Sequence, residues 1–251
     1  MGTPPTVSLD LPSKLTGTTY RLHLSATAPA ADTGEPRPLV LVMDGDDQFS
    51  FALAAYEKMH AAGRVPALLL AGVGYGAGYR QSANRRMRDY TPTAMAGETG
   101  TGGAETFRRA LRDEIIPFLA QRFAVSPHDR GITGHSLGSL FGLYAFFHPE
   151  PLFPRCLASS PSIWYDDRSV LKLEAGFARG HSTLPGRLFL SVGEEDSLSM
   201  TGDLTLLEEA LAARPYAGLT VINRRFAQRD HYNVLPDAFE AGLVALYSSS
   251  R

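Results

Sequence analysis

The chain has little cysteine and no long apolar run, and each shortage excludes a class of protein. A single cysteine among the 251 residues, Cys156, permits neither an internal disulfide nor a zinc site built from several cysteines. The longest apolar run, residues 65–73, has the length of a strand, whereas a membrane-spanning helix needs roughly 18–20 apolar residues. We therefore expect no membrane-spanning segment, and we expect Cys156 to be an ordinary core residue.

Charged residues are almost evenly balanced in sign, with 24 Lys+Arg against 26 Asp+Glu and a net charge of -2. Nucleic-acid binding depends on a basic excess that neutralises phosphates, so nucleic acid is not expected as a partner. The first residues lack the apolar core and basic leader of a secretion signal, which favours a cytoplasmic location. A periplasmic location stays open if a signal peptide has been removed.

Short apolar runs typical of strands alternate along the chain with amphipathic runs typical of helices. This alternation predicts an α/β fold, with a mostly parallel sheet of about eight strands and helices on both faces. The elements use up residues 5–248, so a single domain is predicted. Ligands of such sheets bind beyond the carboxyl ends of the strands. The expected strands are residues 6–11, 18–26, 38–43, 67–73, 131–134, 157–160, 187–192 and 219–224, and the expected helices are 49–62, 104–123, 137–147, 204–213 and 236–247.

A Gly-x-Ser-x-Gly sequence stands between the predicted strand 131–134 and the predicted helix 137–147. It reads Gly134-His135-Ser136-Leu137-Gly138. The bare pattern is short, but a strand before it and a helix after it form the setting of a nucleophile elbow, in which the serine sits on a strained turn. The alternative is a glycine-lined turn whose serine caps the helix. We predict that Ser136 is a nucleophile.

A serine hydroxyl needs a base, and in this type of fold the order along the chain is serine, acid, histidine. His231 lies between the last predicted strand and the last predicted helix, where the base belongs. The acid should follow the preceding strand, where the chain reads Glu194-Glu195-Asp196. The spacing favours Asp196, with Glu195 as the alternative and Glu194 the least favoured. Three adjacent acids also suit a solvated turn.

An oxyanion hole needs two backbone N–H donors. One is predicted at Leu137, directly after the nucleophile. The other is predicted at Asp46, in the loop after the third predicted strand, where Gly45 gives the chain freedom to turn. The acids of this loop, Asp44, Asp46 and Asp47, lack the twelve-residue spacing of a calcium-binding EF-hand, and no metal site is predicted. Capping of the next helix by one of them is compatible with the oxyanion role.

Arginines gather in a loop beyond a central strand, on the side where the active site is expected. They are Arg85, Arg86 and Arg88. They suit bidentate contacts to an anionic or catecholic substrate, or else they order the loop through ion pairs with aspartates. Tyr75 and Trp164 are predicted to line the substrate pocket, with a place in the core as the alternative.

Segments spread over nearly the whole chain match one family in order. They are residues 41–49, 72–75, 84–92, 102–107, 134–141, 159–164, 193–196 and 230–231. On these residues the chain resembles the putative esterase (esterase D-like) family of α/β-hydrolases, most closely its enterochelin (siderophore) esterase-like branch. The resemblance implies an eight-stranded sheet, a nucleophile at Ser136, a base at His231, and neither a metal nor an organic cofactor. The chain departs from the family at Ser139, where a second glycine often follows the motif.

The predicted function is hydrolysis of a small carboxylic ester by Ser136, His231 and Asp196. Ser136 attacks the carbonyl, His231 transfers the proton, the acid orients the imidazole, and water deacylates the enzyme. The arginine loop suggests a siderophore-type lactone as the substrate. The alternatives are an acyltransferase on the same triad and a catalytically silent binding domain. The oligomeric state stays open.

Overall fold

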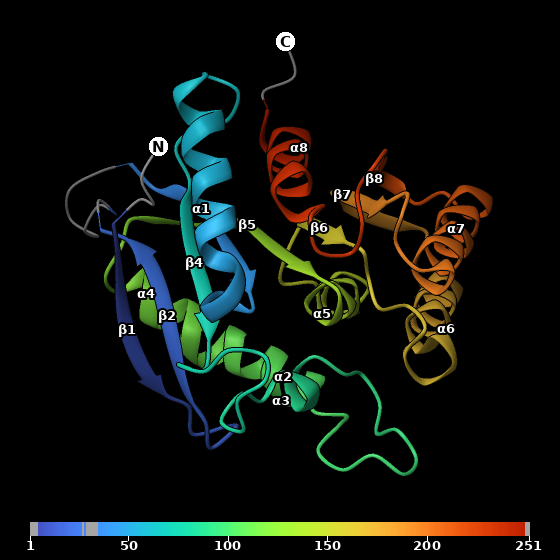
Figure 1. The fold of residues 1–251 in the computed structure, drawn as a ribbon, viewed down its shortest axis with the longest axis horizontal. Helices are drawn as coiled ribbons and strands as arrows, with labels where there is room; N and C mark the ends of the chain where they lie inside the picture. Colours follow the sequence, from blue (N-terminus) through green and yellow to red (C-terminus); the bar gives the residue numbers. More distant parts are fainter. Residues whose placement is uncertain (1–4, 27, 29–34, 249–251) are drawn as a thin grey trace.

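The computed structural model describes residues 5–26, 28 and 35–248, which form one twisted sheet flanked by helices (Figure 1). The strands are β1 (Thr6–Pro12), β2 (Thr19–Ser25), β3 (Arg37–Met43), β4 (Leu69–Gly74), β5 (Val125–His135), β6 (Arg155–Ser159), β7 (Thr183–Gly193) and β8 (Ala217–Phe226). The helices are α1 (Gly45–Ala61), α2 (Arg86–Asp89), α3 (Ala104–Ala110), α4 (Ile116–Ala120), α5 (Leu137–Phe146), α6 (Tyr165–Gly180), α7 (Leu198–Ala213) and α8 (Leu235–Tyr247). A π-helical turn, Leu111–Ile115, joins α3 to α4.

The strand order in the sheet is β1-β2-β4-β3-β5-β6-β7-β8. β1 pairs with β2, and β2 with β4, in antiparallel fashion, whereas all the pairs from β4 to β8 are parallel. The carboxyl ends of β3 to β8 therefore meet at one edge of the sheet, where ligands of such folds bind. The predicted fold class, a mostly parallel eight-stranded sheet flanked by helices, is confirmed. The assignment of residues 5–248 to a single domain stays a prediction.

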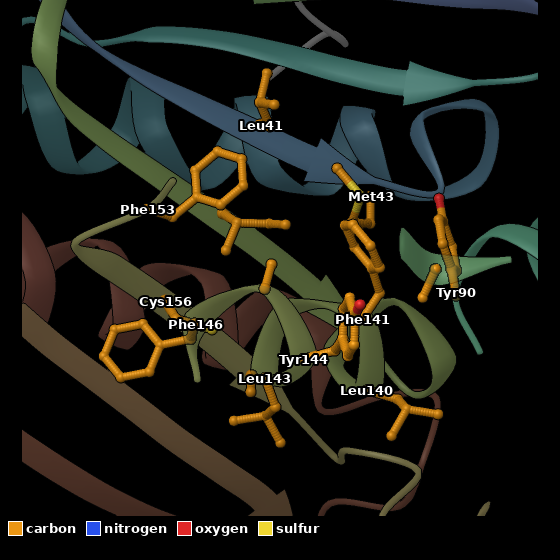
Figure 2. Packing of buried hydrophobic residues seen from close by; sticks show 14 of the residues in the cluster. Leu41, Met43, Tyr90, Leu140, Phe141, Leu143, Tyr144, Phe146, Phe153 and Cys156 are labelled. Atoms are coloured by element: carbon orange, nitrogen blue, oxygen red, sulfur yellow. The ribbon is translucent and has the colours of Figure 1, made fainter. Parts of the chain in front are cut away.

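The continuous apolar run of β3 serves two cores. Leu39, Leu41 and Met43 pack in the cluster that contains residues of α5, and Figure 2 shows Met43 beside α5. Val40 and Val42 pack in a second cluster, with residues of α1 and α8. Figure 1 shows α1 and α8 on one side of the sheet and α5 on the other. A central strand covered on both faces has no solvent side, so its sequence does not alternate.

Cys156 lies on β6 and is fully buried, as predicted. Its sulfur lies 3.3 Å from the point that a Cβ on Gly142 of α5 would occupy. Burial raises the pKa of the Cys156 thiol, so this group stays protonated and unreactive.

The helices differ from the predictions at several points. α1 begins at Gly45 rather than at residue 49, so Asp46 lies in the first turn of a helix and not in a loop. The helix predicted over residues 104–123 contains the π-helical turn directly before α4, and Pro117 stands in the first turn of α4. α6 is not among the predicted helices, and its first turn is not regular, because residues 166–168 have positive φ angles.

Gly45 brings α1 into backbone contact with β4. A Cβ on Gly45 would lie 2.6 Å from the carbonyl carbon of Gly72 and 2.8 Å from the amide nitrogen of Val73. We expect Gly45→Ala to displace α1 from the sheet and to lower the free energy of unfolding by about 1–3 kcal/mol. The matched control is Gly202→Ala in α7, where no described atom lies within 4 Å of the new Cβ. This control should raise the free energy of unfolding by up to about 1 kcal/mol. Urea unfolding measures both, and equal losses would contradict the prediction.

Candidate active site

Ser136 occupies a sharp turn between β5 and α5. Its φ of 58° and ψ of -121° are unusual for a residue with a side chain, and such strain is typical of functional turns. The turn depends on the flanking glycines, because a Cβ on Gly134 would lie 2.4 Å from the carbonyl carbon of Gly138. The strand and the helix thus cross in backbone contact, and the serine stands at the carboxyl edge of the sheet.

His231 and Asp196 meet across two loops at the same edge. Nδ1 of His231 lies 2.8 Å from Oδ2 of Asp196, and the two side chains are 22% and 3% exposed. The second oxygen of Asp196 accepts a hydrogen bond from the amide of Ser197 at 2.7 Å, which fixes the carboxylate. Glu194 and Glu195 are exposed. Of the three candidate acids, Asp196 is the one whose carboxylate contacts His231 in the structure.

Gly193 allows the two loops to approach each other. A Cβ at this position would lie 2.1 Å from the carbonyl oxygen of Arg229 and 3.0 Å from that of Asp230. The side chain of Asp230 also shapes the loop of His231, because its Oδ1 accepts hydrogen bonds from the amides of Tyr232 and Asn233, each at 2.8 Å. The position of the imidazole is therefore set by backbone contacts as well as by the carboxylate.

His135 packs against His231. The ring centroids are 4.5 Å apart with an interplanar angle of 47°. Nδ1 of His135 lies 3.2 Å from the hydroxyl of Ser159, and within the described chain its buried Nε2 has no hydrogen-bond partner. Burial, followed by the charges of His231 and Arg86, lowers the pKa of His135 to about 3. His135 is thus a neutral ring at physiological pH and links Ser136, its neighbour in sequence, to His231.

Ser162 contacts Ser136 directly, and sequence reasoning gave it no role. The two hydroxyl oxygens are 3.2 Å apart, and the amide of Ser162 donates to the carbonyl of Ser136 at 3.2 Å. Ser162 is fully buried. The signal in the sequence is its place just after β6, at the edge of the sheet where side chains converge.

The structure places Asp46 on the β4 side of β3, away from β5 and its serine. Its carboxylate accepts hydrogen bonds from the amides of Tyr75 at 2.5 Å and Gly76 at 3.2 Å, and it lies 2.9 Å from Nε2 of His23. These contacts tie α1 to β2 and to the chain after β4. The backbone nitrogen of Asp46 lies 2.9 Å from the point that a Cβ on Gly74 would occupy, and the oxyanion role of its N–H stays a prediction. Leu137 is the first residue of α5, where the N–H groups of a helix lack partners within the helix.

Arg86 forms a bidentate ion pair with Asp44, at 2.8 Å and 3.0 Å. The Asp44 side chain is fully buried and that of Arg86 is 16% exposed. Burial raises the pKa of the Asp44 carboxyl, and the guanidinium of Arg86 opposes that rise. Asp44 also approaches the Ser136 turn, because its Oδ2 lies 3.0 Å from the point that a Cβ on Gly138 would occupy. Arg86 is therefore brought to the active-site edge, where it is already paired.

Arg88 turns away from this edge. Its guanidinium bonds Asp89 at 2.6 Å, the carbonyl of Thr16 at 3.3 Å and the hydroxyl of Thr18 at 2.8 Å. Buried Asp89 also accepts a hydrogen bond from the hydroxyl of Tyr75 at 3.1 Å. These contacts fit the structural alternatives for Arg88 and Tyr75, an ion-pair network and a core aromatic, rather than a place in the substrate pocket.

Two predicted pocket residues are accessible. Arg85 is exposed, and its guanidinium donates to the carbonyl of Ser82 at 2.7 Å. Trp164 is 42% exposed and comes directly before α6, two residues after Ser162. Tyr232, next to His231, is 79% exposed. Exposed aromatic side chains therefore stand two residues after Ser162, which contacts Ser136, and directly after His231.

Within the described ranges, no group of three or more His, Cys, Asp or Glu side chains is placed to hold a metal ion. No helix among the described residues combines the length and apolarity needed to cross a bilayer.

The sequence profile of the "Putative esterase" family matches residues 13–233. The chain belongs to this family. It is 32% identical over 139 residues to the siderophore triacetylfusarinine C esterase of Aspergillus fumigatus, a match that covers 54% of this chain and about half (48%) of that enzyme. It is 27% identical over 238 residues to the ferri-bacillibactin esterase BesA of Bacillus subtilis, covering 87% and 81% of the two chains.

The crystal structure of the BES protein from Bacillus cereus superimposes on this fold with a TM-score of 0.86 and 27% identity, covering 99% of this chain and 97% of that one. These findings confirm the predicted family, its siderophore-esterase-like branch and an esterase as the class of enzyme. They do not bear on the roles predicted for individual residues in this esterase.

The buried ring of His135 should make the stability of the protein sensitive to mild acid. The folded-state pKa of about 3 lies below the ordinary value of 6.5, so the unfolded chain binds more protons between these two values. The stabilisation is therefore complete above pH 6.5 and is lost as pH falls toward 3. Relative to the non-titrating variant His135→Phe, the wild type should lose about 2 kcal/mol between pH 7.5 and pH 5.

Urea unfolding at the two pH values measures this difference. The control is His128→Phe, at an exposed histidine, which should follow the wild type. A parallel pH dependence of the wild type and His135→Phe would show that His135 does not carry the effect.

Proposed function

We propose that the chain is a serine carboxylic-ester hydrolase in which Ser136 is the nucleophile, His231 the general base and Asp196 the acid of the triad. The observation that carries the proposal is the 2.8 Å contact between His231 and Asp196 at the edge where the strained Ser136 turn stands. A carboxylate on Nδ1 fixes the imidazole tautomer and leaves Nε2 to accept the serine proton. The ring of His135 joins the two halves of this arrangement.

The reaction follows from these positions. Ser136 Oγ attacks the ester carbonyl while His231 takes its proton, and the negative charge of Asp196 stabilises the imidazolium. The imidazolium then protonates the leaving alcohol, and a water molecule activated by the same histidine cleaves the acyl-enzyme. The N–H of Leu137 is proposed as one oxyanion donor, and the junction between β3 and α1 is proposed to supply the second.

The proposed substrate is a small ester, and a siderophore-type lactone is the specific candidate. Support comes from the relatives in Aspergillus and Bacillus, which are named as esterases of siderophores. Arg85 is an exposed cation beside the Arg86–Asp44 pair and suits an anionic catecholate substrate. Trp164 is the exposed aromatic proposed to line the site.

Ser136→Ala, His231→Ala and Asp196→Asn test the triad. We expect hydrolysis of p-nitrophenyl acetate to fall at least about 1,000-fold for the first two variants, because the nucleophile and the base act as a unit. Asp196→Asn should fall by a smaller factor that is still above about 100-fold, whereas Glu195→Gln is the matched control and should stay within about twofold of the wild type. A fluorophosphonate should label the wild type at Ser136 and leave Ser136→Ala unlabelled. Esterase activity in unlabelled protein would exclude the proposal.

A substrate panel tests the lactone proposal. The panel contains p-nitrophenyl acetate, a feruloyl ester and an anionic catecholate lactone, with product analysis in the presence of an added alcohol acceptor. Arg85→Ala should raise the KM for the lactone about tenfold and leave the KM for the neutral acetate unchanged. Arg179→Ala, at the exposed far end of α6, is the control. Activity on short esters without any on the lactone would contradict the substrate, and transfer to the alcohol would identify an acyltransferase.

A further inference from the structure

The turn after β6 touches both halves of the proposed catalytic apparatus. Ser159 is the last residue of β6, Ser162 ends the turn that follows, and both are buried. The carbonyl of Ser159 accepts a hydrogen bond from the amide of Ser136 at 3.0 Å, and the amide of Ser162 donates to the carbonyl of Ser136 at 3.2 Å. The backbone here therefore bonds both the N–H and the carbonyl of Ser136.

The side chains of the same two serines point to different groups. The hydroxyl of Ser162 lies 3.2 Å from that of Ser136. The hydroxyl of Ser159 lies 3.2 Å from Nδ1 of His135, whose ring packs on His231 at a centroid distance of 4.5 Å. One hydroxyl is thus aimed at the nucleophile, and the other reaches the base through an intervening ring.

The backbone between the two serines is strained. Ser160 has a φ of 42°, although it is not glycine and stands before Pro161, a position that favours an extended conformation. The amide of Ser160 donates to the carbonyl of Ser191 at 2.7 Å, which anchors the strained residue to β7. Strain of this kind persists only where the surrounding structure enforces it, and it concentrates at functional sites. Here it reverses the chain so that Ser162 returns to the serine turn.

We propose that Ser162 and Ser159 are positioning residues, Ser162 holding the hydroxyl of the nucleophile and Ser159 holding, through His135, the ring of the base. This inference rests on the proposed triad of Ser136, His231 and Asp196. A nucleophile whose hydroxyl is held in place loses less freedom when it attacks, and small displacements of reacting groups cost large factors in rate. A fixed ring of His135 keeps water from one face of His231.

Ser162→Ala and Ser159→Ala test the two positioning roles separately, because each change removes a single oxygen atom. Ser162→Ala should lower kcat on p-nitrophenyl acetate and the rate of inactivation by a fluorophosphonate, each about fivefold, with KM unchanged within twofold. Ser159→Ala should also lower kcat. In addition it should move the acidic limb of the pH profile of kcat/KM to higher pH by several tenths of a unit, because water admitted beside His231 favours the imidazolium.

The matched control is Ser169→Ala. Ser169 is a buried serine of α6 whose hydroxyl bonds the carbonyl of Tyr165 at 3.2 Å, so its loss should leave kcat, KM, the inactivation rate and the pH profile unchanged. Circular dichroism and urea midpoints establish that each variant is folded. If Ser162→Ala does not fold, Ser162→Cys, with a weaker hydrogen-bonding group of similar size, takes its place.

The outcomes distinguish this inference from the triad on which it rests. Wild-type rates of inactivation and turnover in Ser162→Ala, with Ser136 still labelled, would overturn the role of Ser162 alone. An unmoved pH profile in Ser159→Ala would overturn the role of Ser159. Absence of labelling at Ser136 in the wild type would instead overturn the proposed triad.

Discussion

The arrangement of the site depends on a crossing of two backbones that leaves no room for a methyl group. β5 enters the Ser136 turn at Gly134 and α5 leaves it at Gly138, and a Cβ on the first would lie 2.4 Å from the carbonyl carbon of the second. Ser136 is held between them at a positive φ angle. The energy needed to keep this geometry comes from the apolar burial of α5 against the sheet, where every residue of the helix is buried.

Two other glycines also allow close backbone contacts at the edge of the sheet. Gly45 brings α1 onto β4, and Gly193 brings the acid-bearing loop onto the loop of His231. The first approach sets the β3–α1 junction, and the second brings the loop of Asp196 against the loop of His231. Asp44, directly after β3, forms a buried ion pair with Arg86, and these two charges would be costly to separate.

Local patterns were enough to predict the sheet, the serine turn and the loops that bear the acid and the histidine. The apolar run of β3 and the glycine-flanked serine carry their structural meaning within a few residues. The contacts of the arginine loop are harder to predict, because Arg88 bonds Thr16 and Thr18, which lie 72 and 70 positions away in sequence. Its partners become neighbours only when the sheet has formed.

Three further details depend on the local backbone of the folded chain. Spacing favours Asp196 over Glu195, but the orientation of adjacent side chains in a loop depends on the backbone, and the structure sets Asp196 against His231. α6 is not predicted, although Val170, Leu173 and Phe177 stand at helical spacing. Its first turn departs from this pattern, because residues 166–168 adopt left-handed conformations. Asp46 is predicted in a loop, whereas α1 begins at Gly45, before its apolar pattern starts.

The burial of Cys156 has a consequence for site-specific labelling. The sole thiol of the chain lies inside the sheet, and burial raises its pKa, so oxidants, alkylating reagents and heavy-metal probes find no reactive partner in the folded protein. A cysteine introduced on the surface, for instance beside Trp164, would then carry a fluorophore or spin label at one defined position. The native cysteine therefore need not be removed before a single label is attached near Trp164.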